Sequence, residues 1–121
     1  MMIHAALAGN PNVGKSTVFN ALTGLRQHTG NWSGKTVEKK TGNATDGGDT
    51  FQITDLPGAY SLHAHSPEEE VTRAYVLAAS ERGEVVVVVC DGGALERNLS
   101  LCLEVLETTS RAVVCVNLMD E

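Results

Sequence analysis

Residues 9–16 constrain what this chain can fold into more than any other segment. They read Gly-Asn-Pro-Asn-Val-Gly-Lys-Ser and match G-x-x-x-x-G-K-[ST], the pattern of a phosphate-binding P-loop. An apolar run, residues 3–8, precedes the segment, and a helical pattern that stops at Gly24 follows it. A strand before the loop and a helix after it form the context in which this pattern holds phosphate, so a chance glycine-rich turn is the weaker interpretation.

The chemistry of phosphate binding explains the residue types in this segment. Gly9 and Gly14 let the backbone bend until successive N–H groups point at phosphate oxygens, and the N-terminus of the following helix adds partial positive charge. We expect Lys15 to reach the β- and γ-phosphates and the Ser16 hydroxyl to ligate Mg²⁺.

The composition fits one domain with an aliphatic core. The 121 residues are 42% hydrophobic but only 4% aromatic, and the formal net charge of −6 argues against a general nucleic-acid binder. The longest strictly apolar run, residues 85–90, is too short to span a membrane, and the N-terminus lacks the features of a secretory signal. We therefore expect a soluble, cytosol-facing polypeptide whose cysteines are buried reduced thiols, namely Cys90, Cys102 and Cys115.

The middle of the chain predicts a β-hairpin. Residues 36–40 and 50–54 are the candidate strands, and the Asp-Gly-Gly-Asp turn at residues 46–49 joins them. Residues 26–35 are polar and interrupted by glycine, which predicts a loop.

Two further helices are predicted, each followed by a buried strand. Ser66 caps the first helix, Glu69 completes a capping box, and the helix ends near Gly83. Residues 85–90 and 112–116 are the two strands. The apolar face of the second helix is predicted to consist of Leu95, Leu99, Cys102, Leu103 and Leu106. Alternating strands and helices predict an α/β fold with helices on both faces of a sheet that is parallel apart from one antiparallel hairpin strand.

A second candidate functional segment, residues 55–58, follows the predicted hairpin and reads Asp-Leu-Pro-Gly. Its carboxylate can hold Mg²⁺ through water, and the Gly58 N–H can meet a γ-phosphate because no Cβ stands in the way. The pattern D-x-x-G is weak alone, since Asp-x-Pro-Gly is a common turn, but after a P-loop it predicts a switch that senses the γ-phosphate. Thr36 is the candidate switch-loop threonine that coordinates Mg²⁺ when a triphosphate is bound.

A third segment, residues 117–120, ends the last predicted strand and reads Asn-Leu-Met-Asp. Asp120 can accept hydrogen bonds from both N1–H and N2–H₂ of guanine, whereas adenine would leave the carboxylate unpaired at a cost in free energy. N-x-x-D is common in ordinary loops, but in order with the other two segments it favours GTP over ATP.

These motifs, taken in order, resemble those of the N-terminal GTPase domain of the ferrous iron transport protein B (FeoB) family, a P-loop NTPase with a Ras-like G-domain fold. The resemblance covers residues 3–120 and rests on Gly-Asn-Pro-Asn at 9–12, Gly-Asn-Trp-Ser-Gly-Lys-Thr-Val-Glu at 30–38, Leu-Pro-Gly-Ala-Tyr-Ser-Leu at 56–62 and Leu-Glu-Arg-Asn-Leu at 95–99. It implies a domain at the cytoplasmic face of the bacterial inner membrane that binds and slowly hydrolyses GTP and controls Fe²⁺ uptake.

The resemblance also implies roles for single positions. Asn12 corresponds to the asparagine that helps bind K⁺ beside the phosphates in potassium-activated relatives, where the ion replaces an arginine finger. Ala59 stands where Ras-like proteins carry a water-orienting glutamine, so backbone groups of residues 32–35 are the expected substitute. The expected catalytic groups are Lys15, Thr36 and Gly58.

The predicted site draws on four segments of the chain. Its nucleotide contacts are Gly9, Asn10, Pro11, Asn12, Val13, Gly14, Lys15, Ser16, Thr17, Gly34, Lys35, Thr36, Val37, Glu38, Asp55, Leu56, Pro57, Gly58, Asn117, Leu118, Met119 and Asp120. The predicted Mg²⁺ ligands are Ser16, Thr36 and Asp55, and the predicted K⁺ ligand is Asn12. The expected cofactors are GTP or GDP, Mg²⁺ and K⁺. The expected partners are downstream helical and transmembrane domains, with a homo-oligomer left open and nucleic acid excluded.

The chain departs from the family pattern at several places. Ser33 stands where the family usually has a small residue or proline, and Lys35 puts a second cation near the K⁺ position where the family usually has an apolar residue. The sequence stops one residue after Asp120, so we expect the fifth motif, a last strand and helix, a regulatory domain and a membrane channel downstream. Without that strand, residues 112–116 should form an open apolar edge.

Other interpretations remain open from the sequence. A soluble Era-like GTPase has the same motifs, although Trp32, Leu118 and the acidic charge argue against it. A nucleotide-binding module without turnover would follow from loss of the fifth motif, and an ATP-dependent P-loop kinase would differ in base preference. His63 and His65, with His28 in the other switch loop, could share a metal ion if extended, yet such histidines more often belong to a solvated loop.

Overall fold

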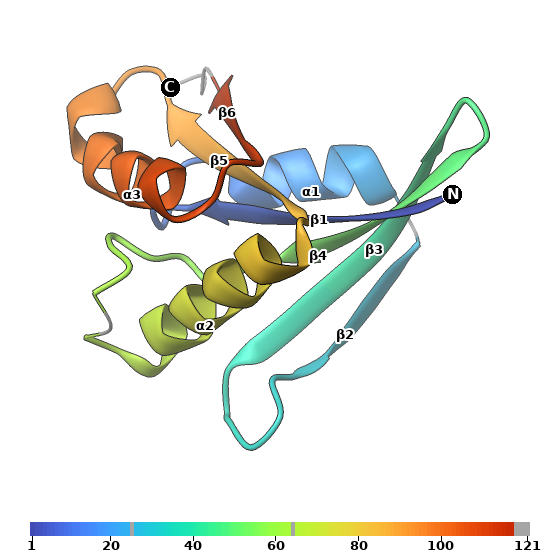
Figure 1. The fold of residues 1–121 in the computed structure, drawn as a ribbon, viewed down its shortest axis with the longest axis horizontal. Helices are drawn as coiled ribbons and strands as arrows, with labels where there is room; N and C mark the ends of the chain where they lie inside the picture. The colour runs from blue at the N-terminus through green and yellow to red at the C-terminus, as the bar shows by residue number, and fades with distance from the viewer. Residues whose placement is uncertain (25, 64, 118–121) are drawn as a thin grey trace.

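The computed structural model describes residues 1–24, 26–63 and 65–117, which form a single six-stranded sheet with helices packed on it (Figure 1). The strands are β1 (Met2–Gly9), β2 (Gln27–Asn31), β3 (Glu38–Asp46), β4 (Asp49–Asp55), β5 (Val85–Asp91) and β6 (Ala112–Asn117). The helices are α1 (Lys15–Thr23), α2 (Pro67–Arg82) and α3 (Leu95–Thr108).

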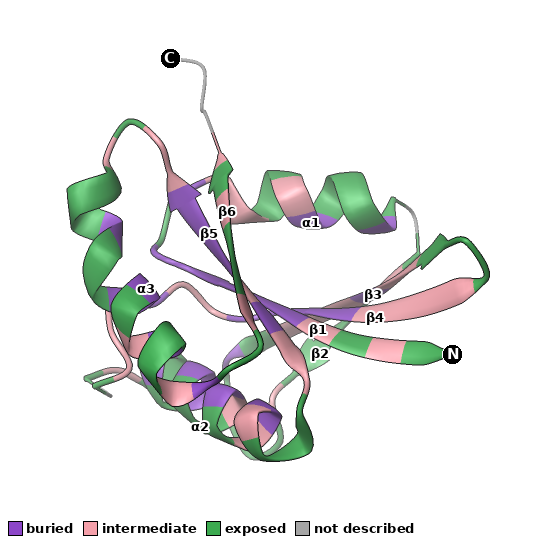
Figure 2. Ribbon diagram, turned by 45° about the horizontal axis from the view of Figure 1, so that its top comes forward, coloured by how far each residue is buried: buried purple, intermediate pink, exposed green. Residues whose placement is uncertain are grey.

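The sheet is mainly parallel and has helices on both faces, as predicted. Its strand order is β2-β3-β4-β1-β5-β6, in which β1 pairs in parallel with β4 and β5, and β5 pairs in parallel with β6. Helix α1 packs against β1, β3 and β4 on one face, whereas α2 and α3 cover the other (Figure 2). The carboxyl ends of β1 and β4 therefore meet at one edge of the sheet, where parallel α/β sheets bind ligands.

The loop predicted for residues 26–35 is wrong in part, because Gln27–Asn31 form strand β2. This strand runs antiparallel to β3, with a register from Gln27 opposite Gly42 to Asn31 opposite Glu38. Four of its five residues are exposed. Periodicity in a sequence reports side-chain burial, so an edge strand that is exposed on both faces carries no pattern to detect.

The predicted hairpin is confirmed, with different bounds for its first strand. Strand β3 begins at Glu38 and extends to Asp46, and it pairs with β4 up to the contact of Asp46 with Asp49. The two turn residues, Gly47 and Gly48, have φ of 57° and 90°. Positive φ at both central residues matches the turn that suits the right-handed twist of a hairpin.

The core lies in two layers, one on each face of the sheet. Ala6 and Ala8 of β1 face α2 and α3, whereas Leu7 between them packs with Phe19 of α1 and Ile53 of β4. This alternation follows from the two-residue period of a strand, and it shows that β1 is buried on both faces. The loop at the end of β1 is thus supported from both sides.

The apolar face predicted for α3 is largely wrong. The buried residues are Asn98, Leu101, Cys102 and Val105, of which only Cys102 was predicted. The four predicted leucines are between 44% and 53% exposed. Leucines occur on both sides of this helix, so a 3.6-residue period alone does not decide which side faces the sheet.

Strand β6 lies at the edge of the sheet rather than in its interior. Val113, Val114 and Val116 are all exposed, so the strand predicted as buried is instead the apolar edge that the sequence also led us to expect. Cys90 and Cys102 are buried free thiols as predicted, whereas Cys115 on β6 is half-buried. In the described ranges, no helix has both the length and the apolar character that crossing a membrane requires.

Candidate nucleotide-binding site

The P-loop connects the end of β1 to the start of α1, where the sequence placed it. Gly9 has no room for a side chain, because a Cβ there would lie 2.8 Å from the Val89 carbonyl oxygen. Gly14 adopts a left-handed φ of 83° at the N-terminus of α1, and Asn12 has a φ of 66°. A cavity of about 470 Å³ lies over this loop and is lined by Asn10, Pro11, Asn12, Gly14, Lys15, Ser16 and Gly58.

Gly58 belongs to the second predicted segment, so the structure brings the two motifs into one cavity. The Lys15 ammonium contacts the Asp55 carboxylate and donates to the Leu56 carbonyl oxygen at 2.6 Å. The side chains of Lys15 and Asp55 are only 11% and 8% exposed. The expected phosphate-binding cation and the expected Mg²⁺-binding carboxylate thus form a buried pair.

Thr36, the candidate switch-loop threonine, lines a cavity together with this pair. A second cavity of about 270 Å³ is lined by Lys15, Thr36, Val37, Glu38, Lys40, Asp55, Leu56, Pro57 and Glu68. Thr36 is exposed, whereas its neighbour Val37, directly before β3, is buried. Gly34 and Lys35 line neither cavity, and Thr17 is an exposed residue of α1.

The Asp-Leu-Pro-Gly turn at residues 55–58 is fixed from two sides. The N–H groups of Leu56 and Ala59 donate to the carbonyl oxygens of Leu7 and Gly9, at 2.9 and 3.0 Å. On the other side, the Thr72 hydroxyl of α2 donates to the Pro57 carbonyl oxygen at 3.0 Å. The turn therefore continues the β4–β1 pairing up to the P-loop.

The loop that follows this turn is held by two carboxylates. Glu69 is buried and accepts hydrogen bonds from the N–H groups of Tyr60 and His65, at 3.0 and 3.2 Å. Glu104 of α3 accepts a hydrogen bond from Leu62 N–H. The predicted capping box is therefore only half right: Ser66 accepts from Glu69 N–H at 3.1 Å, but the Glu69 carboxylate binds the loop after Gly58.

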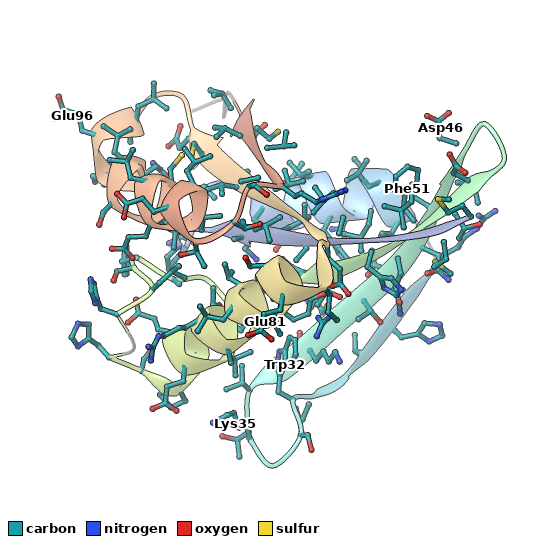
Figure 3. All side chains as sticks on the ribbon, viewed as in Figure 1. Trp32, Lys35, Asp46, Phe51, Glu81 and Glu96 are labelled. Atoms are coloured by element: carbon teal, nitrogen blue, oxygen red, sulfur yellow. The ribbon has the colours of Figure 1, made fainter. Side chains whose placement is uncertain are left out.

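The loop between β2 and β3 packs on α2 through aromatic and charged contacts (Figure 3). The Trp32 and Tyr75 rings meet edge to face, with centroids 5.9 Å apart, and the Lys39 ammonium lies 4.5 Å from the centroid of Trp32. Burial raises the pKa of the Tyr75 hydroxyl. The Lys35 ammonium lies 3.5 Å from the Glu70 carboxylate, an exposed pair that draws this cation toward α2.

The third segment is only partly described. The Asn117 side chain donates to the Val13 carbonyl oxygen at 3.2 Å, which joins the end of β6 to the P-loop. The predicted base contacts Leu118, Met119 and Asp120 lie outside the described residues.

Contacts behind the P-loop join Asn10, a predicted nucleotide contact, to residues of α3 for which no role was predicted. The Asn10 side chain is buried and donates to the Arg97 carbonyl oxygen at 2.8 Å, so the P-loop is attached to the first turn of α3. The buried Asn98 donates to the Ala94 carbonyl oxygen at 2.7 Å. A buried asparagine on the polar side of a helical pattern is not distinguishable from an exposed one by sequence alone.

In the described part of the chain, the histidines do not belong to any group of three potential metal ligands among His, Cys, Asp and Glu. The His63 side chain is 80% exposed, and its Nε2 atom lies 3.9 Å from Glu104.

Comparison with known proteins gives consistent results. The family model of ferrous iron transport protein B matches residues 3–121. The Fe(2+) transporter FeoB of Methanocaldococcus jannaschii is 53% identical over 102 residues, which cover 84% of this chain but 15% of that protein. The chain thus spans a small part of the curated relatives it matches.

Solved structures agree with this assignment. The G domain of the T. maritima FeoB iron transporter matches with a TM-score of 0.89 at 44% identity, over 96% of this chain and 72% of that one. The cytosolic domain of the same transporter matches in its GDP form I with a TM-score of 0.86 at 45% identity, over 94% of this chain and 44% of that one. Its GMPPNP form matches with a TM-score of 0.80 at 43% identity, over 93% and 44%. From the family match, the shared fold and the P-loop geometry, we conclude that this chain belongs to the FeoB family of ferrous iron transport proteins and has the fold of its G domain.

Proposed function

We propose that this chain binds GTP and GDP, hydrolyses GTP slowly, and regulates Fe²⁺ uptake by a larger transporter at the cytoplasmic face of the membrane. The observation that carries the proposal is that Asp55 and Gly58 lie beside Lys15 of the P-loop, with Thr36 nearby. Relatives of the same fold have been solved with GDP and with GMPPNP, and this likeness supports a guanine nucleotide here. Adenine nucleotides and an Era-like role are disfavoured by the family match.

The residues around the P-loop fit a magnesium ion. The Asp55 carboxylate already accepts a cationic group, the Lys15 ammonium, and Ser16 and Thr36 line the adjoining cavities. Oxygen ligands of this kind are those that Mg²⁺ prefers. When bound, Mg²⁺ would neutralise charge on the β- and γ-phosphates. Asp55, Ser16 and Thr36 would hold it, and Lys15 would then be free to bind phosphate.

The proposal includes a potassium ion, with Asn12 as its ligand. This residue lines the cavity over the P-loop, and its backbone has a left-handed φ of 66°. Its amide oxygen has the chemistry of a K⁺ ligand. Lys35, the cation that could compete with K⁺, is paired with Glu70.

Slow hydrolysis follows from what stands next to Gly58. Ala59 is 1% exposed and has no polar side chain, and its N–H is already bonded to the Gly9 carbonyl oxygen. Neither group is available to orient water, so backbone groups of residues 32–35 are the proposed substitute. Without a well-placed side chain, turnover should stay low.

The hydrolysis proposal is tested by measuring phosphate release from GTP in potassium and in sodium buffers. We expect slow release that K⁺ accelerates and Na⁺ does not, with Asn12→Ala removing the difference. Lys15→Ala is the control without phosphate binding. If wild type matches Lys15→Ala in both buffers, the chain is instead a nucleotide-binding module without turnover. If wild type turns over equally in K⁺ and Na⁺, the role of Asn12 is wrong.

A further inference from the structure

Thr72 makes an unusual hydrogen bond for a threonine inside a helix. Such a hydroxyl commonly bonds to the carbonyl four residues earlier in its own helix. Thr72 is fully buried, and its hydroxyl instead donates to the carbonyl oxygen of Pro57, at 3.0 Å and fifteen positions earlier in the chain. The bond therefore joins α2 to the turn that is expected to sense the γ-phosphate.

This bond fixes the direction of one peptide group. The peptide between Pro57 and Gly58 is planar and trans, since no cis peptide occurs in the described residues. In a trans peptide, C=O and N–H point in opposite directions. Because the Pro57 carbonyl points at Thr72 on α2, the Gly58 N–H points away from α2, on the side of the P-loop cavity that Gly58 lines.

The neighbouring peptides are held by other contacts. Leu56 N–H and Ala59 N–H donate to β1 residues, whereas the Gly58 N–H has no acceptor among the hydrogen bonds of the described residues. Rotation of the Pro57–Gly58 peptide would not break either of those two bonds. The Thr72 hydroxyl is the side-chain contact that opposes this rotation.

We propose that Thr72 is a positioning residue for discrimination between GTP and GDP, because it holds the Gly58 N–H toward the position of a γ-phosphate. The inference rests on the proposed function and adds a residue to its machinery. Thr72 touches no nucleotide itself. Substitution of Thr72 should weaken the binding of a triphosphate but not that of a diphosphate. Only a triphosphate has a γ-phosphate oxygen that can accept a hydrogen bond from the Gly58 N–H.

The test compares the affinities of fluorescent GDP and GMPPNP analogues for wild type, Thr72→Val and Thr72→Ser, all with Mg²⁺. Valine keeps the shape of threonine and removes the hydroxyl, and serine restores the hydroxyl. We expect Thr72→Val to lower GMPPNP affinity about three- to ten-fold, as for one lost hydrogen bond, with GDP affinity changed less than about two-fold. Thr72→Ser should recover the wild-type ratio.

Thr23→Val is the matched control. Thr23 is another buried threonine whose hydroxyl donates to a main-chain carbonyl, that of Phe19 at 2.8 Å, at the far end of α1. Its substitution should leave the ratio of the two affinities unchanged. Equal losses of GDP and GMPPNP affinity in Thr72→Val would show a merely structural role and overturn the inference. Unchanged affinities for both nucleotides would overturn it as well.

A measurement on wild type covers the case in which Thr72→Val does not fold. The Gly58 amide should exchange with solvent rapidly in nucleotide-free protein and with GDP, and slowly with GMPPNP. Equal exchange with GDP and GMPPNP would overturn the inference while the proposed function stood. Wild type that binds neither nucleotide would instead overturn the proposed function, and this inference with it.

Discussion

The Lys15 ammonium is bonded to the Asp55 carboxylate, so the P-loop cation and the carboxylate at the end of β4 neutralise each other within the protein. A phosphate group and Mg²⁺ offer each of them a new partner of opposite charge. Nucleotide binding should therefore exchange one buried pair for two charge-assisted contacts. Nucleotide with Mg²⁺ should displace this pair more readily than nucleotide alone.

Asp55→Asn should separate the stabilising and the ligand-binding roles of this pair. The substitution leaves the Lys15 charge buried without its partner, so we expect the nucleotide-free protein to lose about 3 kcal/mol of stability in urea denaturation. GDP affinity in EDTA should rise, because a phosphate then compensates Lys15. The gain in affinity on adding Mg²⁺ should fall at least about ten-fold.

The control for this substitution is Asp49→Asn. Asp49 pairs with the N-terminal amine at 3.7 Å, and that pair is exposed, so its loss should cost less than about 1 kcal/mol. If Asp55→Asn retained the wild-type response to Mg²⁺, Asp55 would have no part in holding the ion.

Glu69→Ala should loosen the loop that follows Gly58. Its carboxylate accepts two backbone N–H groups, and hydrogen bonds to a charged group stabilise more than neutral ones. Amide exchange at Tyr60 and His65 should accelerate at least about ten-fold. Glu68→Ala is the matched control, since Glu68 is exposed on the same helix turn. Unchanged exchange in Glu69→Ala would show that other contacts hold the loop.

Gly58→Ala should disturb the contact between the two motifs. A Cβ at this position would lie 3.0 and 3.1 Å from Cγ and Cα of Pro11, so Pro11 or the turn must shift by a few tenths of an ångström. We expect GMPPNP affinity to fall about ten-fold or more, with GDP affinity less affected. Gly93→Ala, where a Cβ makes only an ordinary 3.5 Å contact, is the control. Equal GMPPNP affinity for wild type and Gly58→Ala would contradict this close approach.

Cys90 should make stability depend on alkaline pH. Burial, with a smaller effect of Cys102, raises the pKa of the Cys90 thiol from 9.0 to about 11. The folded protein thus keeps this proton more tightly than the unfolded chain, so the stabilisation is complete below about pH 9 and decreases as the pH rises through 11. Urea midpoints at pH 8 to 10.5 should fall more steeply for wild type than for Cys90→Ala. Parallel curves would contradict this effect of burial.

The sequence predicted the parts of the molecule whose chemistry is local. The P-loop needs glycine where Val89 comes close and at a left-handed φ, and those needs are visible at Gly9 and Gly14. The hairpin turn has glycine at positions 47 and 48 because both have positive φ. Motif order then predicted that residues 55–58 would reach the P-loop, as they do.

The parts that could not be predicted depend on tertiary contacts. Strand β2 is defined by its backbone pairing with β3. Helix α3 has apolar residues on more than one side, and packing against the sheet determines which of them are buried. Glu69 matched a capping box locally, yet its carboxylate accepts from Tyr60 and His65 because the loop after Gly58 passes beside it. No spacing in the sequence indicates that Thr72 reaches Pro57.

The most direct test of a guanine-nucleotide site is competition for a fluorescent GDP analogue bound to the wild-type chain with Mg²⁺. We predict that unlabelled GDP and GTP displace the analogue at concentrations at least about a hundred-fold below those needed for ADP and ATP. Lys15→Ala should not bind the analogue. Displacement by ATP and GTP at similar concentrations would contradict the guanine preference, and an analogue that binds Lys15→Ala as well as wild type would contradict the P-loop as its site.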